Sequence, residues 1–193
     1  MLPDGKLYEI QVVAEFVPGD DSPALGPVSR ERGPQVPRAT EAVDLLARMW
    51  VAELQAGNVI LYPEDAPGSV ETLVAAPAGA TTVSLAFSQS GWPHIACDSN
   101  AGAWLWWYDT LAEEYTTLTV THGSSPILTM DDKRLTASLE NRNDILLFYV
   151  APGGLAMRRQ RDRFGDEIIV ADASGRIVRA GLTVGWRVQV EME

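Results

Sequence analysis

The sequence predicts a mainly β protein, either an antiparallel β-sandwich or a set of partial propeller-like blades, with one amphipathic helix near the N-terminus. Short apolar segments recur about every ten residues after residue 69, and turn-forming residues separate them. This spacing is typical of sandwiches, barrels and propellers. Hydrophobic residues make up 46% of the 193 residues and charged residues 21%, so the chain can build a packed core.

The N-terminal region begins with a segment, residues 7–17, that is rich in β-branched and aromatic residues and predicts a strand. Residues 18–37 then carry eight proline or glycine residues, which exclude regular structure. Such a stretch cannot bury enough apolar surface to order itself. We therefore expect residues 18–37 to form an extended arm that lies on another subunit.

The predicted helix covers residues 40–56. Thr40 is suited to the N-cap, and Gly57-Asn58 is a stop signal. Apolar residues recur between them at helical spacing, namely Ala42, Leu45, Leu46, Met49, Trp50 and Leu54. A short strand is expected at 59–62.

The rest of the chain predicts a β domain, residues 69–193, after an N-terminal region of residues 1–68. The expected strands are 70–75, 81–87, 92–97, 103–108, 115–121, 125–130, 144–150, 154–160, 166–171, 176–180 and 182–190.

A weak internal repeat lies within this domain. Pro93 to Asp98 matches Pro126 to Asp131 at a period of 33, and each copy leads into a bulky strand. This is the strand order of a propeller blade, but a propeller needs about four blades or more. Two blades would require closure by other subunits, or the sheets would pack as an open sandwich.

The charge pattern excludes several function classes. Twenty-six acidic and 15 basic residues give a net charge of −11, which argues against nucleic-acid binding. No apolar run approaches the roughly 20 residues of a membrane span, and the N-terminus lacks the pattern of a signal peptide. The single Cys97 excludes an internal disulfide framework. We expect no cofactor and no metal.

Five acids are candidates for a glycosidase carboxylate pair: Asp98, Asp131, Asp132, Glu113 and Glu114. The alternative is that an aspartate at a strand end closes a turn through its own side chain.

The histidines and the cysteine offer little for catalysis or metal binding. His94 and Cys97 are three apart on an expected strand, so their side chains point to opposite faces and cannot share a metal. His122 lies in a turn beside two serines, but no nucleophile-elbow motif is present.

The aromatic run predicts an interface or a core. On a strand, Trp104, Trp106 and Tyr108 share one face, and Leu105 and Trp107 share the other. A strand that is apolar on both faces is most simply buried between two layers or at a subunit interface. The alternative is a platform on which sugar rings stack.

The basic residues gather in one cluster. At strand spacing, Arg159, Arg161 and Arg163 line one face. This row is suited to pairing with carboxylates of a neighbouring subunit, and the alternative is a solvated edge strand guarded by charge.

The stretch from Ser125 to Phe164 resembles virion structural proteins of tailed bacteriophages. The matching segments are Ser125-Pro126, Met130-Asp131-Asp132-Lys133-Arg134, residues 143–150, Gly153-Gly154-Leu155 and Arg159-Gln160-Arg161-Asp162-Arg163-Phe164. Ala156-Met157 stands where the family has an aromatic pair. The resemblance implies a tail-tip or tail-fibre component, assembled in the host cytoplasm and located in the virion. It carries no catalytic residues over to this chain.

Two functional hypotheses remain from the sequence. The first is a non-enzymatic structural component of a phage tail, which contacts other tail proteins and forms a homo-oligomer. Three copies are favoured because tail tips and fibres commonly have three-fold symmetry. The second is a carbohydrate-binding or glycoside-hydrolysing β protein that recognises a bacterial surface glycan.

Overall fold

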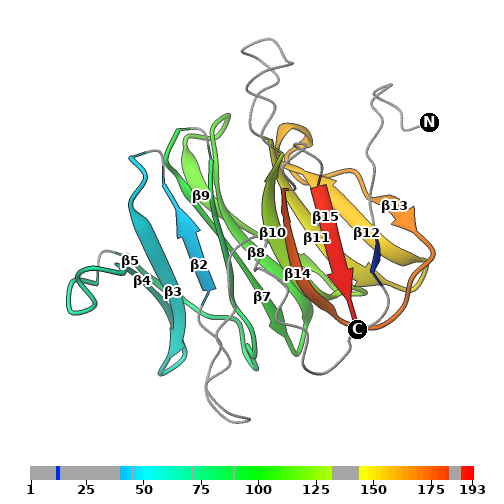
Figure 1. Ribbon diagram of the computed structural model, residues 1–193, viewed down its shortest axis with the longest axis horizontal. Helices are drawn as coiled ribbons and strands as arrows, with labels where there is room; N and C mark the ends of the chain where they lie inside the picture. Colours follow the sequence, from blue (N-terminus) through cyan, green and yellow to red (C-terminus); the bar gives the residue numbers. More distant parts are fainter. Residues whose placement is uncertain are drawn as a thin grey trace.

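The computed structural model describes residues 12–13, 40–44, 46–70, 72–88, 90–131, 144–182 and 188–193. These residues are mainly β, and their strands form four sheets that lie side by side across the molecule (Figure 1). Within the described part of the chain, no helix has the length and apolar character needed to cross a membrane.

Three of the sheets are antiparallel meanders of four strands in chain order. The first sheet comprises β2 (Thr40–Val43), β3 (Met49–Gln55), β4 (Asn58–Pro63) and β5 (Thr72–Ala75). The second sheet comprises β6 (Ser84–Phe87), β7 (Pro93–Ser99), β8 (Gly102–Asp109) and β9 (Glu114–Val120). The third sheet comprises β10 (Ser124–Asp131), β11 (Asp144–Ala151), β12 (Gly154–Arg159) and β13 (Ile168–Ala171), with a 3₁₀ turn at Gln160–Asp162.

The fourth sheet joins strands that are far apart in the sequence. It pairs β14 (Ile177–Leu182) with β15 (Val188–Met192), and β15 pairs in parallel with β1 (Val12–Val13). β1 and β15 therefore lie at the opposite end of the molecule from β3 and β4 (Figure 1).

The sheets pack face to face, with a hydrophobic core between each neighbouring pair. One edge strand of each sheet packs against an edge strand of the next: β2 contacts β6, β6 contacts β10, and β10 contacts β14. Leu61 and Ile95 belong to the core between the first two sheets, and Leu105 and Leu147 to the next. Phe148 and Val190 belong to the core between the third and fourth sheets. A strand in the middle of this stack is buried on both faces, which explains its continuous apolar sequence.

The predicted β segments after residue 58 are confirmed. Each segment expected from 59–62 to 176–180 contains a strand, with ends shifted by a few residues. The last expected segment, 182–190, divides between the end of β14 and the start of β15, and residues 183–187 lie outside the described part.

The predicted helix at 40–56 is wrong, because this segment forms the hairpin of β2 and β3. Asp44 holds the turn: its Oδ1 accepts the backbone N–H of Leu46 at 2.8 Å and of Arg48 at 2.9 Å. Its Oδ2 accepts the indole N–H of Trp50 at 2.8 Å. Ala47 has a φ of 60°, which no right-handed helix permits. The apparent helical spacing arose because apolar residues of two strands were counted together with an exposed Leu46 in the turn.

The 33-residue repeat does not match the sheets. It pairs Pro93 at the start of β7, the second strand of its sheet, with Pro126 in β10, the first strand of the next. The positions that do correspond between the second and third sheets are Gly102 and Gly154. They begin the third strand of each sheet, β8 and β12, with φ of 115° and 121°. At each, an added Cβ would collide with a carbonyl oxygen of the last residue of the fourth strand, Val120 or Ala171. The structural repeat is therefore the whole four-stranded meander.

The expected boundary between residues 68 and 69 falls between β4 and β5, which pair in the first sheet. The expected arm at 18–37 lies outside the described residues, and of the expected strand 7–17 only Val12–Val13 is described.

Candidate functional site: an aromatic surface on the second sheet

Four aromatic rings gather on the face of the second sheet that is turned toward the first sheet. We call Trp92, Trp106, Tyr108 and Tyr115 the aromatic surface. The rings of Trp106 and Tyr115 stack with centroids 3.9 Å apart and planes 1° from parallel. Those of Trp92 and Tyr108 stack at 4.2 Å, and Tyr115 meets both of these rings edge-on. Trp92 and Tyr115 remain 39% and 36% exposed.

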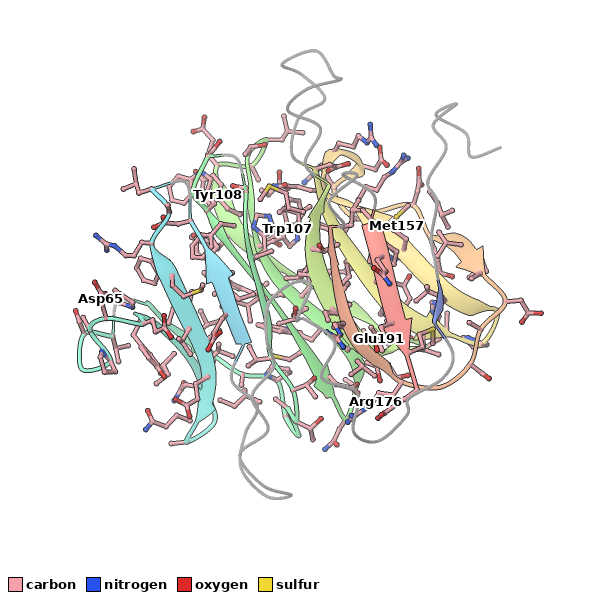
Figure 2. The ribbon with its side chains drawn as sticks, in the orientation of Figure 1. Asp65, Trp107, Tyr108, Met157, Arg176 and Glu191 are labelled. Atoms are coloured by element: carbon pink, nitrogen blue, oxygen red, sulfur yellow. The ribbon has the colours of Figure 1, made fainter. Side chains whose placement is uncertain are left out.

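The pleat of β8 places these rings. Trp104 and Trp106 belong to the core that faces the first sheet, whereas Leu105 and Trp107 belong to the core that faces the third. Figure 2 shows Trp107 and Tyr108 on opposite sides of the sheet. The prediction of two apolar faces is confirmed. Trp104 is buried, so only Trp106 and Tyr108 of the predicted interface aromatics reach the aromatic surface.

Sequence reasoning missed Trp92 and Tyr115. Tyr115 is the register partner of Tyr108, and Trp92 directly precedes β7. The signal for both was the pairing of β8 with its two neighbours, which a single sequence does not display. Burial and then the neighbouring Tyr108 raise the pKa of Tyr115 to about 12, so its phenol is neutral at physiological pH. The aromatic surface is therefore an uncharged patch on a strongly acidic chain.

The candidate carboxylates that the structure describes lie near a strand end or at a turn. The Oδ2 of Asp98 accepts the backbone N–H of Ser125 at 3.1 Å, which ties β7 to β10. Glu113 is exposed in the turn before β9, and Glu114 is the exposed first residue of β9. The side chain of Asp131 and the whole of Asp132 lie outside the described residues. Asp98 thus binds the backbone of the third sheet, 27 residues away, and this contact does not close a turn at the end of its own strand as expected.

A buried carboxylate that the sequence analysis did not single out lies at the end of β8. Asp109 is 2% exposed, and its Oδ2 accepts the Nε of Arg163 at 2.9 Å. Its Oδ1 accepts the backbone N–H of Leu111 at 3.0 Å. Burial alone would raise the pKa of Asp109, but these hydrogen bonds and the arginine charge outweigh burial and lower it. This ion pair joins the second sheet to the loop that follows β12.

The predicted arginine row is wrong in its geometry. The 3₁₀ turn at Gln160–Asp162 and the left-handed backbone at Arg163, with φ of 52°, end the extended strand. The guanidinium groups pair within the chain: Arg159 with Asp162 at 2.7 Å, Arg161 with Asp144 at 2.9 Å, and Arg163 with Asp109. Their role in a subunit interface stays a prediction.

A second polar cluster joins the third sheet to the turn before it. Glu167 Oε2 accepts the hydroxyl of Tyr149 and lies 2.7 Å from Nε2 of His122. Arg158 donates to the Tyr149 oxygen at 2.7 Å and to the carbonyl oxygens of Phe164 and Gly165 at 2.7 Å.

The protonation of this cluster opposes nucleophilic chemistry at Tyr149. Burial and then the hydrogen bond to Glu167 raise the pKa of Tyr149 far above its usual value, so its oxygen stays protonated. Burial would raise the pKa of Glu167, but the hydrogen bonds from Tyr149 and His122 lower it. The arrangement holds the loop of residues 163–167 against the sheet.

His94 and Cys97 lie on opposite faces of β7, as predicted. His94 is fully buried beside the rings of Trp107 and Phe164, whereas Cys97 belongs to the core facing the first sheet. Burial lowers the pKa of His94 to about 4 and raises that of Cys97 to about 12. Across the residues that the structure describes, no three His, Cys, Asp or Glu side chains are grouped as a metal site requires.

Comparison with known protein families, with curated proteins and with solved structures finds no match for this chain. Any assignment of function therefore depends on its own residues and their geometry.

Proposed function

We propose that this protein is a structural component of a bacteriophage tail that acts through contacts with other subunits and catalyses no reaction. The aromatic surface carries the proposal. Aromatic residues are enriched at the centres of protein interfaces, and here four of them lie together on a rigid sheet and remain partly exposed. The resemblance of residues 125–164 to virion structural proteins supports a place in the tail.

The arrangement of the sheets supports assembly as well. Four sheets whose first strands lie next to one another are interpreted as blades of an open propeller. β2 and β14 belong to the two terminal sheets; β2 packs against β6, and β14 packs against β10. Other subunits would cover these ends, as a homo-oligomer within the tail requires.

The use of the polar side chains also favours a contact function. Asp98, Asp109 and Glu167 each bind a neighbouring sheet or loop through their carboxylates. Groups committed to such contacts are poorly placed to exchange protons with a substrate.

The test is the composition of purified phage particles from the host that carries this gene. Mass spectrometry should find the chain in the particles, and immunogold labelling should place it on the tail. Replacement of Trp92 and Tyr115 by alanine together should reduce its incorporation at least about tenfold, as loss of an interface hot spot does. Leu46→Ala, at an 82% exposed apolar residue in the turn between β2 and β3, is the control. Absence of the wild-type chain from purified particles would contradict the proposal.

The exposed rings favour one other function, recognition of a bacterial surface glycan. An exposed tryptophan face can stack on a sugar ring, and Trp92 is the most exposed tryptophan of the aromatic surface. Titration of the purified protein with bacterial surface polysaccharide, followed by tryptophan fluorescence, tests this function with Trp92→Ala as the variant. Hydrolysis of the polysaccharide that Asp98→Asn abolishes would replace the structural proposal with a glycosidase.

A further inference from the structure

The second sheet ends in a long edge strand, β9. Its seven residues pair with β8 on one side, and no other strand of the described residues pairs with β9. The strands that end the first and third sheets, β5 and β13, have four residues each. β9 is thus the longest of the fourth strands, and an unprotected edge of this kind is a template for pairing with another strand.

The direction of the free backbone groups on β9 follows from its ladder with β8. Ala103 donates its N–H to the carbonyl of Gly123, on the β9 side of β8. Successive residues of an antiparallel ladder direct their backbone groups to opposite sides. Leu105 is therefore directed toward β9 as well, and its register partner Leu118 is directed back toward β8.

The three residues that alternate with these positions direct their N–H and C=O groups away from β8. They are Tyr115, Thr117 and Thr119, and all three side chains are exposed. Three donors and three acceptors in a row, at strand spacing, fit one extended strand.

The sequence of this edge lacks the usual protection. From Tyr115 to Val120 it has no charge, proline or glycine, and three of its six residues are threonine. Edge strands are normally guarded by lysine, proline or a bulge. The other face of β9 packs through Leu118 and Val120 onto the core between the second and third sheets, so the edge is held in place.

We infer that β9 pairs with β9 of a second copy of this chain, antiparallel and about a two-fold axis at Thr117. In this register Thr117 faces its own counterpart, and Tyr115 faces Thr119 of the second copy. All three outward residues of each copy then pair, which gives six backbone hydrogen bonds across the axis. The inference goes beyond the proposed function and does not depend on a place in a phage.

The charge pattern selects this partner and this direction. The chain carries a net charge of −11, so two copies can approach closely only where the surface is uncharged, as it is from Tyr115 to Val120. Parallel pairing would place Glu114 beside its counterpart. Antiparallel pairing separates the two Glu114 side chains by about 20 Å, six strand positions, which exceeds the screening length of about 8 Å at physiological salt.

The pairing would also enlarge the aromatic surface. Tyr115 lies at the margin of that surface, and its side chain shares a face with those of Thr117 and Thr119. Two copies joined through β9 would form one eight-stranded sheet with two aromatic surfaces on the same face.

The test is the mass of the full-length protein by analytical ultracentrifugation across a concentration series. Thr117→Pro removes one outward N–H from each copy without removing a bond to β8. It should raise the dissociation constant about 100-fold, about tenfold for each of the two lost bonds. Thr117→Val keeps the N–H and the strand propensity, so it is the matched control and should associate like the wild type. Circular dichroism checks that both variants are folded.

Hydrogen exchange distinguishes the second copy from other occupants of the edge. The amides of Tyr115, Thr117 and Thr119 should exchange slowly only at concentrations at which the protein associates. A monomer at all concentrations, or slow exchange in a monomer, would overturn the inference. A trimer whose mass is the same for the wild type and Thr117→Pro would overturn it too. A hexamer that Thr117→Pro converts to a trimer would support the inference, because the β9 pairing would then join two trimers.

Discussion

The two faces of the second sheet carry similar residues in different surroundings. Trp106 and Trp107 are neighbours in β8, yet Trp107 is 5% exposed in the core with the third sheet and Trp106 is half-buried in the aromatic surface. Polar links lie on the Trp107 side, where Asp98 and Asp109 bind groups of the third sheet and its loop. The comparison shows that neighbouring sheets, rather than the strand's own composition, decide which tryptophan is structural.

The largest expected loss of stability comes from single tryptophan truncations in β8, one on each face of the sheet. Trp107→Ala should lower the free energy of unfolding by about 4 kcal/mol, because it opens a cavity in a closed core. Trp106→Ala should lower it by about half as much, about 2 kcal/mol, because solvent can fill part of the space. Urea unfolding of both variants measures the difference, and equal losses would remove the distinction between the faces.

The buried histidine on the Trp107 side predicts a pH dependence. His94 has a pKa of about 4 when folded against 6.5 ordinarily. The unfolded chain therefore binds the proton more strongly between these values, and stability falls as pH drops from 6.5 toward 4. At pH 5 the loss should be about 2 kcal/mol relative to pH 7.5.

The variant His94→Phe isolates this contribution. It should remove the part of the pH dependence of the unfolding free energy that His94 causes. His122 is present in both proteins, so its contribution cancels in the comparison. Urea unfolding at several pH values measures the slope. Identical pH profiles for the variant and the wild type would show that His94 is not buried in its neutral form.

The ion pair on the Trp107 side should have a smaller effect. Arg163→Ala leaves the buried carboxylate of Asp109 without its charged partner, and it should cost about 1 to 2 kcal/mol because the arginine itself is half exposed. Arg176→Ala is the control, since Arg176 pairs with the exposed Glu193 and its loss should cost under about 1 kcal/mol. Thermal unfolding of the two variants gives the comparison.

The smallest stability effect is expected on the aromatic surface itself. Trp92→Ala should change the free energy of unfolding by less than about 1 kcal/mol, since the ring lies outside the closed cores. The same urea measurements apply. A loss as large as that of Trp107→Ala would make Trp92 a core residue and remove the basis for a contact surface.

The fold was largely predictable from the sequence, because buried strands separated by turn residues are a local signal. The hairpin at β2 and β3 was not, since its turn depends on three hydrogen bonds to the single side chain of Asp44. The bend after β12 depends on the left-handed backbone at Arg163 and Phe164, which non-glycine residues rarely adopt.

The candidate site was predictable only in part. Alternation placed Trp106 and Tyr108 on one face, because that pattern belongs to one strand. Tyr115 joins them through strand register, and Arg163 reaches Asp109 across 54 positions of the chain. Neither contact has a local signature in the sequence.

The parallel pairing of Val12 with Val190 has a consequence for the order of folding. During synthesis, β1 leaves the ribosome long before its partner β15 exists. The meanders of the first three sheets pair neighbours in sequence, so they can form while the chain is still growing. The fourth sheet can be completed only after β15 has been made, so β1 is synthesised before the meanders and finds its partner after them.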